Sequence, residues 1–241
     1  MIIEIIKKFL RKVKYTIFPR PIIIIEYNTY SQAGEDAVLS FLFADKGMNK
    51  ISYLDVGTNL PDFCSNTYLF YLRGSRGVCV EADKTLIPEI KKVRPNDIII
   101  NAGVAVSDMA EANFYIFDIT GINTFDKDEA ERRQAHGTYK IKQVVKVPLI
   151  SINQILKENF SSCPDFLSID IEGLDLDVLK SLDFNTSPIP VICVETCTYS
   201  ENHIRPKDYT IAEFMTSKGY EVYADTYINT IFVNKNWFYK S

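Results

Sequence analysis

Residues 51–102 read ISYLDVGTNLPDFCSNTYLFYLRGSRGVCVEADKTLIPEIKKVRPNDIIINA, and they alternate short apolar runs with longer segments that carry charges. Short apolar runs bounded by turn residues are typical of buried strands. The predicted order is strand 51–56, helix 65–72, strand 77–81, helix 84–93 and strand 97–102. A βαβαβ order of this kind predicts a parallel sheet with helices packed on its faces.

The rest of the chain continues the alternation of strands and helices. The predicted elements are strands 113–117, 144–149, 165–170 and 191–195, helices 174–182 and 211–218, and a final antiparallel pair of strands, 220–224 and 229–233. A polar stretch, residues 118–143, is predicted to be a long loop or a small insertion. With 241 residues, 46% of them hydrophobic, the chain has the material for one α/β domain, which we place at residues 27–241.

Residues 1–26 are predicted to be a separate basic amphipathic segment. Six Lys or Arg against Glu4 give residues 1–20 a charge of +5, whereas the 21 basic and 30 acidic residues that follow give the remainder -9. The formal net charge of -4 gives no reason to expect a nucleic acid partner, because phosphate binding needs a clustered basic face.

The same segment is the candidate for contact with a membrane. It is too charged to span a bilayer, and no later apolar run approaches the ~20 residues that a spanning helix needs. It also lacks a signal-peptide cleavage site, so the sequence predicts a cytoplasmic protein without a transmembrane span. The segment would pack on its own domain, on a second subunit, or on anionic lipid at the inner membrane face, and the sequence leaves these alternatives open.

Residues at the carboxyl ends of the predicted strands are the candidates for ligand binding, because parallel sheets bind ligands there. Gly57 and Asn59 lie at the turn after the first strand, where glycine lets the backbone approach a ligand closely. Glu81 ends the second strand, with Ala82 beside it, at a position suited to accept hydrogen bonds from ribose hydroxyls. Asn101 ends the third strand, where it would flank an adenine ring.

Asp55 indicates which nucleotide cofactor binds at this turn. Gly57 is the only glycine of the turn, so the GxGxxG pattern of dinucleotide sites is missing. An acidic residue here would repel a pyrophosphate but attract a sulfonium that carries an ammonium group. The turn therefore favours S-adenosylmethionine over NAD.

The stretch FLSIDIEG, residues 166–173, ends an apolar strand in two carboxylates. Asp170 and Glu172 would point to the same side of a continuing strand, and Glu195 ends a neighbouring strand. Converging carboxylates raise one another's pKa, which suits a general base, or they bind a divalent cation such as magnesium. His203, on the loop after Glu195, is another candidate base. We favour a metal-free carboxylate or histidine base over a metal site, and a helix cap is the alternative for Glu172.

Five motifs in a fixed order resemble those of FkbM-family methyltransferases, and the resemblance runs from about Tyr30 to Val233. They are YSQAGEDAVL (30–39), YLDVGTN (53–59), VCVEAD (78–83), LSIDIEGLDLDVLKSL (167–182) and INTIFV (228–233). The resemblance implies a Rossmann-like class I fold, with a seven-stranded mixed sheet flanked by helices and an antiparallel last strand. It also implies methyl transfer from S-adenosylmethionine to an oxygen, commonly a sugar hydroxyl of a glycan or a glycosylated metabolite.

The resemblance also assigns roles to residues. Asp55, Gly57, Asn59 and Glu81 would hold the cofactor, while Asp170 and Glu172 would lie at the reaction centre. YSQAGEDAVL would cover the cofactor, with Ser31 and Gln32 as the contacts. The alternative for this motif is a capped helix start with Ser31 and Glu35 near the capping positions. Thr58 replaces a more usual alanine, and Ala82 and Asp83 stand where proline is common, so the ribose loop departs from the family pattern.

The acceptor has no readable motif. Its pocket is expected from residues 118–139 and 199–209, with Arg132, Arg133 and Lys140 as contacts for an anionic group, and Asn229 reaching the site from the last strand. Two other functions remain open. One is a noncatalytic scaffold within a glycan assembly complex, and the other, disfavoured by the missing glycines, is an NAD-dependent oxidoreductase.

Overall fold

The computed structural model describes residues 28–107, 109–171, 173–197 and 207–240. The basic segment 1–26, Glu172 and His203, for which the sequence predicts roles, lie outside these ranges. Within them, no helix is both long enough and apolar enough to cross a membrane.

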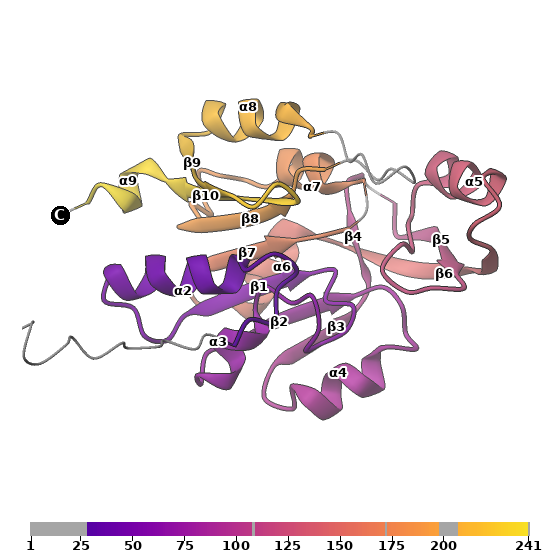
Figure 1. The fold of residues 1–241 in the computed structure, drawn as a ribbon, viewed down its shortest axis with the longest axis horizontal. Coiled ribbons are helices and arrows are strands. Elements are labelled where there is room, and N and C mark those ends of the chain that lie inside the picture. The colour runs from indigo at the N-terminus through magenta and orange to yellow at the C-terminus, as the bar shows by residue number, and fades with distance from the viewer. Residues whose placement is uncertain (1–27, 108, 172, 198–206, 241) are drawn as a thin grey trace, which may run out of the picture.

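Seven strands of the described chain form the main sheet, in the order β3-β2-β1-β7-β8-β10-β9 (Figure 1). They are β1 (Ser52–Val56), β2 (Arg76–Glu81), β3 (Ile98–Asn101), β7 (Phe166–Ile169), β8 (Val191–Glu195), β9 (Tyr220–Asp225) and β10 (Asn229–Asn234). Strands β3 to β8 in this order run parallel, whereas β10 runs antiparallel to both β8 and β9. The predicted mixed sheet with an antiparallel last strand is confirmed.

Helices cover both faces of the main sheet (Figure 1). The described helices are α2 (Glu35–Asp45), α3 (Tyr68–Leu72), α4 (Ile87–Val93), α5 (Lys127–Ala135), α6 (Ile152–Asn159), α7 (Asp175–Ser181), α8 (Tyr209–Ser217) and α9 (Lys235–Phe238). Because side chains alternate along a strand, Tyr53 of β1 packs with α2 and α3, and its neighbour Leu54 packs with α6 and α7.

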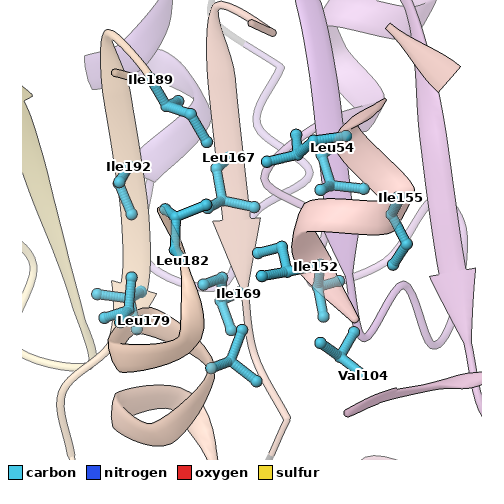
Figure 2. Packing of buried hydrophobic residues seen from close by; sticks show 14 of the residues in the cluster. Leu54, Val104, Ile152, Ile155, Leu167, Ile169, Leu179, Leu182, Ile189 and Ile192 are labelled. Carbon is cyan, nitrogen blue, oxygen red and sulfur yellow. The ribbon is translucent and has the colours of Figure 1, made fainter. Parts of the chain in front are cut away.

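The apolar layer under α6, α7 and α8 is the larger part of the core. Figure 2 shows the strand residues Leu54, Leu167 and Ile192 packed with Ile152 of α6 and Leu179 of α7. Each of these side chains is fully buried, which stabilises the fold by about 1.5–3 kcal/mol per side chain. The packing fixes the carboxyl ends of β1, β2, β7 and β8 relative to one another, and the site lies at those ends.

A second, three-stranded sheet stands beside these strand ends. It has the order β4-β6-β5, with β4 (Gly103–Ala105) parallel to β6 (Ile141–Ser151) and β5 (Glu111–Phe117) antiparallel to β6. The polar stretch predicted as a loop or a small insertion contains α5, whose first turn is capped by Asp126 through the N–H groups of Asp128 and Glu129. The stretch is thus an ordered insertion that projects from the main sheet (Figure 1).

Candidate active site

A cleft opens at the carboxyl ends of β1 and β2. The space between its walls, including its open mouth, is about 710 Å³. Its lining comes from the ends of β1 and β2, from β4, from the turn after β7 and from the insertion. Of the predicted cofactor residues, Gly57, Asn59, Glu81 and Ala82 line this cleft, and so does the predicted catalytic residue Asp170.

Gly57 brings the turn after β1 against the turn after β7. Its φ of +83° belongs to the left-handed region, and a Cβ placed on it would lie 1.9 Å from the carbonyl oxygen of Asp170. The backbone N–H of Asp170 in turn donates to the carbonyl of Val56 at 3.0 Å. No side chain fits between the two turns, so glycine is required here.

Glu81 places its carboxylate at the edge of the cleft. The oxygen Oε2 accepts from the backbone N–H of Asn59 at 2.8 Å, and Oε1 accepts from that of Asp83 at 2.7 Å. Burial raises the pKa of Glu81 to about 7, against the opposing effect of these two donors. Near neutral pH the side chain is therefore close to its titration midpoint.

Asn59 carries an unusual polar atom. Its φ is 48°, and among the described residues its side-chain Oδ1 is buried without a hydrogen-bond partner. A buried acceptor without a donor is costly, which is why such atoms often mark a ligand position. By contrast, Asn101 lies outside the cleft lining, and its Nδ2 donates to the carbonyls of Glu81 and Ala82 at 2.8 and 3.1 Å.

The apolar wall of the cleft was missed by the sequence analysis. It is formed by Leu86, Val104, Phe114 and Phe125, and the two phenylalanine rings lie 4.6 Å apart. A Cβ on Gly103 would lie 2.3 Å from the ring of Phe125, so the ring packs directly on this glycine. Phe125 lies in the polar insertion, where a single aromatic residue has no periodicity to identify it.

Asp55 is not in the cleft lining. Its carboxylate accepts a hydrogen bond from Thr67 at 2.6 Å and pairs with Arg94 at 3.3 Å. Asp55 shares a strand face with Tyr53, on the side of α2 and α3, whereas Val56 turns toward the cleft. This placement does not support a direct contact between Asp55 and a cofactor.

Residues 29–36 lie against the loop after β1 without lining the cleft. The Asp36 carboxylate accepts from the Ser31 hydroxyl at 2.8 Å and from the Tyr30 N–H at 2.7 Å, while Gln32 is exposed. The carbonyl of Tyr30 accepts from the N–H of Ser65 at 2.8 Å. Contacts of Ser31 and Gln32 with a cofactor stay predictions.

The capped helix start at this motif is confirmed in part. Helix α2 begins after Gly34, which offers no side-chain cap, but the Ser31 hydroxyl accepts from the first-turn N–H of Asp36 at 3.2 Å, and Glu35 accepts from the N–H of Ala33 at 2.8 Å. Glu35 also accepts from Thr226 at 2.6 Å and from Asn229 of β10 at 2.9 Å. Asn229 thus reaches the carboxyl edge, opposite Glu195 in the register of β10 and β8.

The predicted group of three carboxylates is not brought together by the described residues. Asp170 lines the cleft, whereas Glu195 lines a second cavity of about 740 Å³, including its mouth. Across the described ranges, no three His, Cys, Asp or Glu side chains are placed to hold a metal ion. Glu172, which completes the predicted group, lies outside those ranges.

The turn between the two cavities is held by Asp175. Its buried carboxylate accepts from the N–H groups of Ile171 and Gly173, both at 3.2 Å. Burial raises its pKa, and the two donors oppose that effect. The sequence analysis missed this role, although an acidic residue at the first position of a helix, just after a glycine turn, is a recognisable signal.

The second cavity is lined by charged residues of α5, by Asp175 and by Glu195. Arg132 and Arg133 both pair with Glu129, and Arg133 also donates to the carbonyl of Ile122 at 2.6 Å. The predicted role of these arginines toward an anionic acceptor is therefore not supported by their contacts. Lys140 is not in the lining of either cavity.

The sequence matches the profile of one protein family. A sequence profile described as "Methyltransferase FkbM domain" matches residues 55–222. No curated protein matches the chain at a significant level.

Several solved structures match most of the chain at low sequence identity. A TehB-like SAM-dependent methyltransferase from Corynebacterium glutamicum is 9% identical, with 95% of this chain and 97% of that chain covered and a TM-score of 0.42. A precorrin-6y C5,15-methyltransferase from Geobacter metallireducens is 12% identical, with 89% and 94% covered and a TM-score of 0.44. An O-methyltransferase from Bacillus cereus, in complex with SAH, is 11% identical, with 95% and 90% covered and a TM-score of 0.42.

Proposed function

We propose that this chain, which belongs to the FkbM methyltransferase family, transfers the methyl group of S-adenosylmethionine to a hydroxyl of a sugar or glycan. Family membership brings methyl transfer and dependence on S-adenosylmethionine. The hydroxyl acceptor, in a surface polysaccharide or a glycosylated metabolite, is the proposed part. The observation that carries it is a polar cavity on the other side of the turn that holds Asp170.

The residues of the cleft fit S-adenosylmethionine. Glu81 would accept hydrogen bonds from the ribose hydroxyls, and the unpartnered Oδ1 of Asn59 would accept one from the ammonium group. Leu86 and Phe125 would contact the adenine ring, and Gly57 leaves room for the amino acid end. When bound, the cofactor supplies an electrophilic methyl carbon that needs no activation by the protein.

Asp170 is the proposed general base. It would accept the proton of the acceptor hydroxyl at its carboxylate, because it is the acidic side chain of the cleft on the turn next to the second cavity. The bonds of Asp175 to Ile171 and Gly173 would keep that turn in position. Glu172 and His203 stay predicted catalytic residues, and Glu195 would orient the acceptor from the second cavity.

The second cavity supports a hydroxyl-rich acceptor. Its lining has five carboxylates, on Asp126, Glu129, Asp175, Glu195 and Asp208, and two arginines that both pair with Glu129. Sugar hydroxyls donate to carboxylates, whereas a phosphate would be repelled. This balance favours an uncharged sugar over an anionic acceptor.

The proposal is tested by methyl uptake. Purified protein and radiolabelled S-adenosylmethionine are incubated with a panel of neutral glycans, sugars, nucleotide sugars and non-sugar alcohols, with and without EDTA and then magnesium. We expect labelling of a neutral sugar or glycan that survives EDTA and is abolished in Asp170→Asn, while binding of S-adenosylhomocysteine persists. Labelling of non-sugar acceptors alone would overturn the sugar assignment, and full activity of Asp170→Asn would remove Asp170 as base.

We further propose that the protein works in the cytoplasm, with the basic segment 1–26 meeting anionic lipid at the inner membrane face or a second subunit. Sedimentation with vesicles of anionic phospholipid, compared between the full chain and a deletion of residues 1–26, separates the two. Loss of sedimentation on deletion supports lipid contact. A change in oligomeric state instead supports subunit contact, and no change in either would contradict both.

A further inference from the structure

We infer that Arg94 is a positioning residue for cofactor binding, which fixes the loop 57–67 from the side opposite the cleft. This loop, here called the β1 loop, carries the cleft residues Gly57 and Asn59. The inference rests on the proposed cofactor site. It also gives a role to Asp55, which does not line the cleft.

Arg94 directly follows α4 and is fully buried, with an exposed fraction of 0%. Its Nε and Nη2 both donate to the carbonyl of Pro61, at 2.9 and 2.6 Å, and Nη2 also donates to the Ser65 hydroxyl at 2.6 Å. A guanidinium presents its donors in one rigid plane, so three such bonds define both the position and the orientation of the β1 loop.

The other arm of the guanidinium fixes the loop to the main sheet. Nη1 donates to the Thr67 hydroxyl at 2.7 Å, and that hydroxyl donates to Asp55 of β1 at 2.6 Å. Nη1 lies 3.3 Å from the Asp55 carboxylate and 3.9 Å from that of Asp97. A buried cation needs such partners, because its removal from water is otherwise uncompensated.

The β1 loop needs external support of this kind. Asn59 and Cys64 both have left-handed backbones, with φ of 48° and 53°. Residues other than glycine keep this conformation where the surrounding structure enforces it. Arg94 contacts the loop at Pro61, Ser65 and Thr67, between and beyond the two strained positions.

The loop connects Arg94 to the charge of Glu81. The backbone N–H of Asn59 donates to Glu81, so a displaced loop would withdraw this donor from the carboxylate. Its loss raises the pKa of Glu81 further, because burial then acts with less opposition. Of the other charged groups, Asp83 of the same segment raises the pKa of Glu81, and Asp170 lines the same cleft. Neither carboxylate is removed by the changes at Arg94 or Thr67.

The test uses Thr67→Val, which removes the bridging hydroxyl and keeps the shape, with Thr67→Ser as the conservative rescue. Arg94→Lys keeps a charge near Asp55 but not the planar set of bonds. S-adenosylhomocysteine binding is measured by calorimetry between pH 6 and 8.5. We expect Thr67→Val and Arg94→Lys to weaken binding about tenfold, which corresponds to the net effect of one or two hydrogen bonds. We also expect the pH below which binding weakens, near 7 in the wild type, to move upward.

Tyr220→Phe is the matched control. It removes a buried hydroxyl that donates to the carbonyl of Ile189 at 2.7 Å, outside the β1 loop and the contacts of Arg94, and should lower stability without moving the affinity or its pH dependence. If Thr67→Val loses stability but keeps both the affinity and the pH dependence, the inference is overturned. If Thr67→Ser fails to restore them, the hydroxyl is not the cause and the inference is overturned too. If the wild type itself does not bind, the proposed cofactor site is wrong and the inference is lost with it.

Discussion

The side-chain amide of Asn229 donates a 2.9 Å hydrogen bond to the carboxylate of Glu35, 194 residues earlier in the chain. The Thr226 hydroxyl and the Ala33 N–H donate to the same carboxylate at 2.6 and 2.8 Å. The first helix of the described chain is thereby joined to β10, at the residue that pairs with Glu195 of β8. Two motifs that the sequence gives no reason to pair, GED and INT, are one structural unit.

Glu35→Gln should destabilise the protein by about 1–3 kcal/mol, because an amide presents a donor where the carboxylate accepts three hydrogen bonds. Burial disfavours the charge of Glu35, but the bonds from Thr226, Asn229 and Ala33 outweigh burial and lower its pKa. Its contribution to stability is therefore present at neutral pH and is lost as the pH falls below about 4.5. Urea unfolding at pH 7 and pH 4 measures both effects. The exposed Glu213→Gln is the control, and an equal loss in the two variants would contradict the assignment.

Gly57→Ala should abolish binding of S-adenosylhomocysteine. The new Cβ would lie 1.9 Å from the Asp170 carbonyl, so the turns after β1 and β7 must separate. Gly137→Ala is a close control because Gly137 has the same φ of +83° with no atom within 4 Å. Both substitutions carry the backbone strain of about 1–2 kcal/mol. Calorimetry should show that Gly137→Ala binds and Gly57→Ala does not. Binding by both variants would mean that the turns after β1 and β7 are not in contact.

The unliganded protein should lose stability as the pH rises toward 7, because of Glu81. Its pKa is raised by burial to about 7, so between about 4.5 and 7 the folded state binds a proton that the unfolded state releases. Glu81→Gln removes this proton and should flatten that part of the stability curve. Thermal unfolding from pH 5 to pH 8 tests it. A curve of unchanged slope in the variant would show that another group causes the dependence.

Asp175→Asn should lower turnover about tenfold with little change in cofactor affinity. The variant keeps one of the two oxygens that accept from Ile171 and Gly173, so the turn that carries Asp170 becomes less well held. Asp177→Asn, on an exposed side chain that pairs with Lys180 of the same helix, is the control. The comparison uses initial rates alongside calorimetry. Equal initial rates for the two variants would show that Asp175 does not position the turn of Asp170 for catalysis.

Much of this site could be predicted from the sequence because it follows strand ends. Gly57, Glu81 and Asp170 each come after an apolar run, and the carboxyl ends of parallel strands meet at one edge. Asp55 shows the limit of that reasoning. It lies in the same motif, yet its place in the strand alternation turns it toward Thr67 and Arg94.

The positions of other residues could not be predicted from the sequence. Arg94 follows an amphipathic helix and precedes a proline, which is the usual setting of a solvated helix end, but it is fully buried. Phe125 reaches the cleft because its ring packs against Phe114 of β5 and on Gly103 of β4, contacts that join segments distant in the sequence. The placement of such residues depends on where distant segments meet.

The insertion between β5 and β6 has a consequence for engineering. Gly121, Asn123 and Phe125 line the cleft, whereas Asp126 and Glu129, directly after them, line the second cavity. Under the proposed function, a chimaera that exchanges the whole insertion with that of a relative would change donor affinity together with acceptor choice. Redesign of specificity should therefore graft only the segment from residue 126 onward and leave the preceding five residues native.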